Sequence, residues 1–353
     1  IQPVFVDFNT AITRSKTRHG LPVLYVKNTD NGIFQLTFKY DFGAYADKRL
    51  NYAADYLDYL GTDKLTAEQI KKQFYKLACD YSIGVGGNNI LVTLGGLAEN
   101  QAEALRLLES VLHGAKADTQ AYQDYVALVK KSRADRMDDQ KSNYRALTAY
   151  AIYGPQSVRK GMMTNEELDQ CDPQSLVALI HGLSGFRHTV EYYGPADLKA
   201  VIAQVDRTHQ TAKKLQAPLQ AEEPMEQPTP KNEVIIAPYE AKNIYMMQYH
   251  NEGLQWTPDR APVINLFNNY FGGGMNTVVF QELRESRGLA YSASANYMSP
   301  QRKGHPEYAQ TTIITQNDKM PDCIRVFNSI IDTIPQGAAA FELARQSLMK
   351  SIA

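Results

Sequence analysis

The chain has 353 residues, of which 44% are hydrophobic and 21% charged, so it is long and apolar enough for two domains with ordinary buried cores. Its 37 basic and 38 acidic side chains leave a net charge of -1, which excludes long-range electrostatic steering onto nucleic acid or an anionic membrane. No run approaches the ~18 apolar residues of a membrane span, and residues 1–4 lack the basic start and the apolar stretch of a signal peptide. The 3 cysteines are widely spaced, which excludes a disulfide framework and a paired-cysteine zinc site.

The first 210 residues alternate between predicted strands and predicted helices. Apolar and polar residues alternate over residues 33–40, and Asp30-Asn31-Gly32 is a turn signal, so this segment is predicted to form a hairpin with residues 21–27. Thr66 and Gln69 have the spacing of a capping box at the start of a helix. The remaining predicted elements are helices over 50–60, 102–113 and 119–139, strands over 81–85, 90–94 and 188–193, a short helix after Pro173 and a helix from about residue 196.

Residues 211–233 differ in composition from the rest of the chain. They carry prolines among Glu, Gln and Lys and show no hydrophobic periodicity, which predicts an extended, semi-rigid linker. Beyond the linker, the patterns predict strands over 233–239 and 244–250, helices over 262–271 and 276–285, strands over 290–298 and 308–315, a helix over 321–334 and a helical pattern from about residue 338.

The order strand, strand, helix, helix, strand, strand, helix occurs on both sides of the linker, so two copies of one module are expected. The predicted fold is therefore α+β, with two homologous domains at 1–210 and 234–353, each a mainly antiparallel sheet packed with helices. The second copy lacks the closing helix, strand and helix of the first. We therefore expect the second domain to be truncated, with exposed apolar surface, and both ends of the chain to be cut edges of a larger protein.

The most specific local pattern is Leu-Arg-Glu-Ser-Arg-Gly-Leu-Ala-Tyr-Ser at residues 283–292. It places Arg284 at the end of a predicted helix and Tyr291 at the start of a predicted strand. A guanidinium has planar donors and a phenol has one donor, which suits binding of a peptide carbonyl or a developing oxyanion. The same residues also fit a purely structural interpretation, as a helix-ending cation and a half-buried strand tyrosine.

This pattern, preceded by a Gly-rich turn and a helix, resembles the second domain of the pitrilysin/insulysin family of zinc metallopeptidases. The resemblance extends over the whole chain, through the repeated module, the Pro-rich linker and the stretch Tyr-Leu-Gly-Thr-Asp-Lys-Leu-Thr from residue 59. It implies an enzyme of two halves with a pitrilysin/LuxS-like metallohydrolase fold. One half carries a zinc helix, and the other supplies an Arg and a Tyr that hold the substrate backbone and help to stabilise the tetrahedral intermediate. Those roles fall on Arg284 and Tyr291.

The chain departs from the family at the zinc motif, His-x-x-Glu-His, in which two imidazoles and a general base share one helical face. Its positions here hold Tyr52, Asp55 and Tyr56, and no Glu occurs between Glu109 and Glu166 to act as the further ligand. Tyrosines are poor neutral ligands and one Asp cannot form a three-ligand site, so no metal is expected in this chain. The sequence has no Ser or Cys nucleophile pattern. The other candidate ligands, His113, His181 and His188, have no helical partner and are interpreted as ordinary half-exposed histidines.

These observations predict the non-zinc half of a clamshell metallopeptidase, inactive in isolation, with zinc on a partner half from the same precursor or a separate subunit. The expected ligand is a peptide substrate. One alternative is a structural or peptide-binding homologue that has lost catalysis altogether, and another is a peptidase with a different metal site. The compartment is unknown, and only the resemblance to bacterial tandem peptidases suggests the periplasm or another exported location.

Overall fold

The structure, a computed structural model, describes residues 6–155, 160–300 and 302–352. The described chain forms two units: the first comprises residues of 6–134 and 159–223, and the second comprises residues of 135–158 and 224–353. The domain boundaries expected from the sequence stay a prediction. Residues 1–4, which lack the features of a signal peptide, and residue 353, at which the second domain was expected to stop, lie outside the described residues.

A six-stranded sheet forms the centre of the first unit, in the order β1-β2-β6-β3-β5-β4. Neighbouring strands are antiparallel except for the parallel pair β2 and β6. Apolar residues at alternate positions of β3, from Phe34 to Tyr40, are buried on one face of the sheet, as the sequence pattern predicts. The strands are β1 (Thr13–Lys16), β2 (Pro22–Lys27), β3 (Ile33–Tyr40), β4 (Cys79–Val85), β5 (Ile90–Leu97) and β6 (His188–Gly194).

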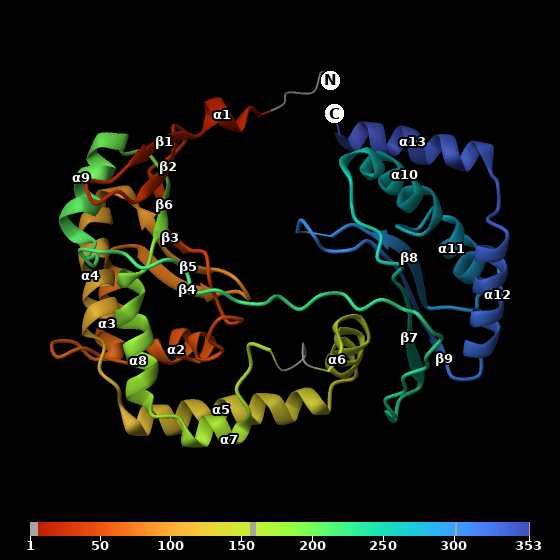
Figure 1. The fold of residues 1–353 in the computed structure, drawn as a ribbon, viewed down its shortest axis with the longest axis horizontal. Helices are drawn as coiled ribbons and strands as arrows, with labels where there is room; N and C mark the ends of the chain where they lie inside the picture. The colour runs from red at the N-terminus through yellow and green to blue at the C-terminus, as the bar shows by residue number, and fades with distance from the viewer. Residues whose placement is uncertain (1–5, 156–159, 301, 353) are drawn as a thin grey trace. The chain divides into compact units, whose positions relative to one another are not determined.

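Helices cover one face of this sheet, and Figure 1 shows α3, α4, α8 and α9 on that side. The capping box predicted for Thr66 and Gln69 is confirmed at the start of α3, where each side chain accepts a hydrogen bond from the other residue's backbone N–H. The helices of the first unit are α1 (Phe8–Ala11), α2 (Arg49–Leu57), α3 (Ala67–Lys76), α4 (Gln101–Gly114), α5 (Thr119–Met137, whose last turn belongs to the second unit), α7 (Asn165–Gln170), α8 (Pro173–Gly182) and α9 (Leu198–Thr208).

The predicted hairpin of residues 21–27 with 33–40 is wrong, because β6 lies between β2 and β3 and pairs with both. The turn at Asp30-Asn31-Gly32 reverses the chain but does not make the two strands neighbours. Strands two places apart are separated by about 10 Å, which a five-residue connection can span. The backbone N–H of Asn28 donates to the carbonyl of Gly194, 2.8 Å away, and so attaches the connection to the end of β6.

The second unit contains a three-stranded antiparallel sheet in the order β7-β9-β8. Its core lies between one face of this sheet and helices α10 to α12, and includes Val279, Leu283, Ile313 and Phe327. On the opposite face, Tyr144 of α6 packs edge-to-face on Tyr245 of β7. The elements are α6 (Gln140–Tyr153), β7 (Asn243–His250), α10 (Ala261–Phe271), α11 (Val278–Phe280), β8 (Ser292–Met298), β9 (Tyr308–Gln316), α12 (Met320–Asp332) and α13 (Ala338–Ile352).

The two sheets share a common part. The order and directions of β7-β9-β8 match those of β3-β5-β4 in the first unit, as expected for a repeated module. The strand predicted over 233–239 is wrong: this segment is extended, but it pairs with no strand among the described residues, and Val234 and Ile236 are 85% and 78% exposed. High β-propensity becomes a strand only where a neighbouring edge offers backbone partners. Within the described chain, no helix is both long and apolar enough to cross a bilayer.

Candidate functional site

The predicted pair Arg284 and Tyr291 lies on either side of a tight connection from helix to strand. The helix that starts with α11 widens at residues Gln281–Glu285, where the N–H of Ser286 donates to the carbonyl of Gln281 five residues earlier, 2.8 Å away. Leu283, fully buried, anchors this turn in the core. The chain then reverses at Gly288, whose φ of +58° is in the left-handed region.

The structure brings the two side chains of this pair together. The guanidinium carbon of Arg284 lies 5.8 Å from the ring centroid of Tyr291 and 4.9 Å from that of Phe280, both within cation–π range. Tyr291 is 74% exposed, although its backbone N–H is held by the carbonyl of Ile314, 2.9 Å away. The result is a fixed backbone that presents a cation and a phenol to solvent at one point.

The Gly-rich turn before this pair, residues 272–274, follows α10 and packs closely against β8. A Cβ atom at Gly272 would lie 1.9 Å from the carbonyl oxygen of Ala295 in β8, so only glycine fits there. Gly273 donates its N–H to the carbonyl of Asn268, 2.7 Å away, which ends α10. Gly274, in contrast, faces open space.

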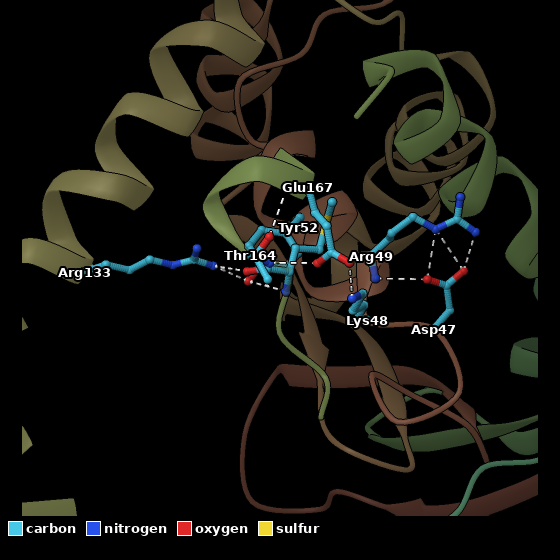
Figure 2. Close-up of polar contacts among 8 residues, drawn as sticks. Asp47, Lys48, Arg49, Tyr52, Arg133, Thr164 and Glu167 are labelled. Atoms are coloured by element: carbon cyan, nitrogen blue, oxygen red, sulfur yellow. Dashed lines mark hydrogen bonds and ion pairs between the residues drawn. The ribbon is translucent and has the colours of Figure 1, made fainter. Parts of the chain in front are cut away.

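The three degenerate zinc-motif positions lie on α2, and the first is occupied by a buried phenol. The oxygen of Tyr52 accepts hydrogen bonds from Nη2 of Arg133 at 2.7 Å and from the N–H of Met163 at 3.2 Å. Arg133, on α5, also donates to the carbonyl of Met163 at 2.7 Å and to Oδ1 of Asn165 at 2.6 Å. Figure 2 shows the Arg133 side chain directed at Tyr52 from the side opposite to Lys48 and Arg49.

The other two positions are also satisfied by protein groups. The hydroxyl of Tyr56, fully buried, donates to the carbonyl of Asp118 at 2.6 Å and accepts from its N–H at 2.9 Å. Asp55 accepts a hydrogen bond of 3.4 Å from the hydroxyl of Tyr125. Burial raises the pKa of the Asp55 carboxyl, against the lowering effect of this bond.

A zinc ion does not fit this arrangement, because the polar atoms are used internally and a guanidinium lies at the first position. Across the described residues, no three or more His, Cys, Asp or Glu side chains are grouped so that they could hold a metal ion. Arg133 and Tyr125 were not predicted from the sequence. Both lie on α5, the later helix on which the resemblance to the zinc family leads one to look for the further Glu ligand, so this helix could have drawn attention to them.

Ion pairs beside Tyr52 attach α2 to α7 (Figure 2). Lys48 donates to Oε1 of Glu167 at 2.5 Å, and Glu167 forms a capping box with Thr164 at the start of α7. Asp47 binds Arg49 through both carboxylate oxygens. Burial alone would raise the pKa of Asp47, but the hydrogen bonds from Arg49 outweigh it and lower that pKa. These contacts hold the helix in place and leave no free carboxylate for catalysis among these residues.

The histidine candidates do not meet at a metal site. His188 lies on β6, as its strand pattern predicts, but it is 4% exposed, so its interpretation as half-exposed is wrong. It is buried because the rings of Phe38, Tyr40 and His209 pack against it. His113 and His181 are partly buried, in agreement with the expectation.

Comparison with known proteins identifies relatives of this fold. The family model described as peptidase M16 inactive domain matches residues 184–348. A protein of Rickettsia felis described as an uncharacterized zinc protease is 22% identical over 305 residues, which cover 80% of this chain and 68% of that protein.

Solved structures give the same fold. A peptidase M16 inactive domain from Pseudomonas fluorescens matches with a TM-score of 0.74 at 15% identity, over 96% of this chain and 83% of that one. The periplasmic protease PqqL from Escherichia coli matches with a TM-score of 0.75 at 14% identity, over 97% of this chain but only 38% of PqqL. A mutant of the ferredoxin protease FusC, solved with Arabidopsis ferredoxin, matches with a TM-score of 0.75 at 12% identity, over 99% of this chain and 39% of FusC. The α+β fold predicted above is confirmed.

Proposed function

Because the chain belongs to the peptidase M16 family and corresponds to its inactive, non-zinc half, we propose that it completes a peptidase with a zinc-bearing half and supplies Arg284 and Tyr291 to that half's zinc site. The zinc half comes from the same precursor or is a separate subunit. Peptide substrate is enclosed between the halves and cleaved at the zinc of the other half.

The observation that carries this proposal is the exposed pair itself. A guanidinium carbon 5.8 Å from a phenol ring, on backbone fixed by Leu283 and Ile314, presents donors from one point to a ligand outside the chain. Arg284 can donate planar hydrogen bonds to a peptide carbonyl, and Tyr291 can donate one to the oxygen that becomes negative in the tetrahedral intermediate. Donors that are already positioned stabilise that charge without reorganisation.

The degenerate positions on α2 support the division of labour. Tyr52, Asp55 and Tyr56 are engaged by Arg133, Tyr125 and Asp118, so the zinc and its activated water must come from another half. FusC was solved with a protein, ferredoxin, which suggests polypeptide substrates for this chain too. The net charge of -1 fits a surface that accepts varied peptides without long-range steering.

The test combines this chain with its zinc half and measures peptide cleavage. We expect the isolated chain to bind no stoichiometric zinc and to cleave nothing, and the combined halves to be active. Arg284→Ala and Tyr291→Phe should abolish most of this activity, and Arg284→Lys should restore part of it because lysine keeps the charge but loses the planar donors. Arg325→Ala and Tyr75→Phe, at exposed positions elsewhere, are the matched controls. Full activity in both site variants would contradict the assigned roles.

A second candidate function is favoured by the same loss of zinc ligands: a peptide-binding or structural homologue without catalysis. It predicts that the combined halves bind peptide but remain inert. Two measurements separate the two functions: fluorescence anisotropy for peptide binding by the isolated chain, and zinc-dependent cleavage by the complex. Cleavage supports the first function, and binding without cleavage supports the second.

A further inference from the structure

Three buried ionisable side chains of the first unit form a line of contacts that the proposed function does not use. Glu109 comes from α4, His188 from β6 and His209 from the residue that ends α9, and they are 3%, 4% and 7% exposed. Buried ionisable groups are costly unless they are paired, so this chain of contacts requires a physical explanation.

The distances define a continuous line of hydrogen bonds. Oε1 of Glu109 lies 2.6 Å from Nδ1 of His209, and Nε2 of His209 lies 2.9 Å from Nε2 of His188. Nδ1 of His188 lies 2.8 Å from the carbonyl oxygen of Phe186. Phe38 stacks on the His209 ring with a centroid distance of 3.9 Å and so covers the line from one side.

The number of protons follows from these contacts. A carbonyl only accepts, so His188 must carry a proton on Nδ1. The contact between two Nε2 atoms requires one proton, and the contact between the carboxylate and Nδ1 requires another. The three hydrogen bonds therefore need three protons, one more than an ionised glutamate and two neutral imidazoles hold.

The surroundings favour the ionised carboxylate of Glu109, so the extra proton belongs to the imidazoles. Oε2 of Glu109 accepts the N–H of Gln210 at 3.1 Å and lies 3.3 Å from Nε2 of His113, and both contacts favour the ionised carboxylate. Burial alone would raise the pKa of Glu109, but these bonds and that from His209 lower it to about 2. Burial and the neighbouring charge of His209 lower the pKa of His188 to about 4. The line then holds three protons on two imidazoles beside a carboxylate.

Both ends of this line touch the first residues of the linker. Glu109 holds the N–H of Gln210, the first residue after His209. At the other end, Phe186 is bridged to Gln216: Arg187 donates its N–H to the carbonyl of Gln216 at 2.9 Å, and Gln216 donates to the carbonyl of Gly185 at 2.8 Å. Loss of the line would therefore loosen the backbone between residues 210 and 216.

We propose that Glu109, His209 and His188 form a proton-dependent clamp that fastens residues 210–216, where the linker begins, to the rest of the first unit and opens on acidification. A fourth proton puts hydrogens on both Nε2 atoms, 2.9 Å apart, and the imidazoles then repel each other. The clamp is closed near neutral pH because three protons satisfy three hydrogen bonds.

The other ionisable groups that face the clamp do not replace it. Tyr40 of β3 contacts the His188 ring, and burial raises its pKa, so its phenol stays neutral throughout. His113 of α4 faces Glu109. His181 of α8 lies near His113, and burial, together with this neighbouring imidazole, lowers the pKa of His181. Acidification therefore adds positive charge around the clamp and strengthens the repulsion.

The protonation state is tested by ¹⁵N NMR of the imidazole nitrogens at about pH 7.5, where free histidine is neutral. We expect the two imidazoles to carry three protons in total, one of them on Nδ1 of His188. Only two protons on the two imidazoles at this pH would overturn the proposal. This measurement uses the unaltered chain, so it does not depend on the folding of a variant.

The clamp function is tested by hydrogen–deuterium exchange of the amides of Gln210 and Gln216, expressed as protection factors. From pH 7.5 to 4.5, protection of these two amides should fall by about tenfold or more, because the folded state resists a proton that unfolded histidine binds. The amide of Ile70 in α3 should change little. Glu109→Gln should lower the protection already at neutral pH, whereas His19→Gln, an exposed histidine, should not. Unchanged protection of Gln210 and Gln216 on acidification would refute the clamp.

Discussion

Nη2 of Arg133 donates a hydrogen bond of 2.7 Å to the phenol oxygen of Tyr52, the first of the three degenerate zinc-motif positions. A guanidinium thus points at the position that the sequence comparison with the zinc motif predicts for a metal ligand. The positive charge and the donor geometry make this contact incompatible with a bound cation, and they stabilise α2 against α5 instead.

Restoring the zinc motif should therefore not restore zinc. The triple variant Tyr52→His, Asp55→Glu and Tyr56→His supplies two imidazoles and a carboxylate on one helical face, but Arg133 remains beside them and the further Glu ligand is absent. We expect less than stoichiometric zinc after dialysis, measured by elemental analysis of the folded variant. One tightly held zinc per chain would show that the site is latent and not lost.

Removal of the Tyr56 hydroxyl should destabilise the first unit. Tyr56→Phe removes the acceptor of the Asp118 N–H and one of the two donors to its carbonyl, which still accepts the N–H of Tyr122 at 3.0 Å, so the free energy of unfolding should fall by about 1 kcal/mol. Urea denaturation measures this change. Tyr75→Phe, at an 85% exposed position of α3, should lie within about 0.5 kcal/mol of the unaltered chain, and an equal loss in both variants would contradict the explanation.

The close contact at Gly272 predicts a difference between neighbouring glycines. Gly272→Ala drives a Cβ into the carbonyl of Ala295, 1.9 Å away, and should cost about 1–3 kcal/mol of unfolding free energy. Gly274→Ala meets open space and should change stability by about 0.5 kcal/mol or less. Thermal and urea unfolding of the two variants provide the comparison, and similar values for both would mean that this turn adapts.

Stability should fall on acidification in two steps. The pKa of His188 is lowered to about 4, so between its ordinary value of 6.5 and 4 the unfolded chain binds the proton that the folded chain refuses, and stability decreases as pH falls. The pKa of Glu109 is lowered to about 2 from 4.5, so its contribution is lost next, between those two values. Asp55, whose pKa is raised by burial, adds stability as pH falls through that raised pKa and so offsets part of the loss. Urea denaturation at a series of pH values gives the unfolding free energy across this range. Between pH 6.5 and 4 this free energy should fall less steeply with pH for His188→Gln than for the unaltered chain, and an equal slope would contradict the assignment.

Much of the local structure was predictable, because it depends on neighbours along the chain. The alternation in β3, the capping box of Thr66 and Gln69 and the helical stripe of α4 each involve residues a few positions apart. The helix α6 was missed, although Asp139 marks its start by accepting the N–H of Ser142. Arg284 was predicted at the end of a helix and Tyr291 at the start of a strand, and the structure brings the two side chains together.

The contacts that define the buried sites were not predictable, because their partners are far apart in sequence. Arg133 and Tyr52 are separated by 81 residues, and His209 and Glu109 by 100. His188 is buried against Phe38 and Tyr40 of β3 and against His209, and no local pattern encodes the position of β6 beside β3.

By itself, the sequence determined most of the elements, indicated the internal repeat and singled out Arg284 and Tyr291, because periodicity, capping and turn chemistry act over a few residues. Only the tertiary structure decided strand order, what replaces zinc at Tyr52, and the line from Glu109 to His188. Those outcomes depend on which distant segments exclude water together, and a buried polar group takes its partner from whatever the fold brings within hydrogen-bond distance.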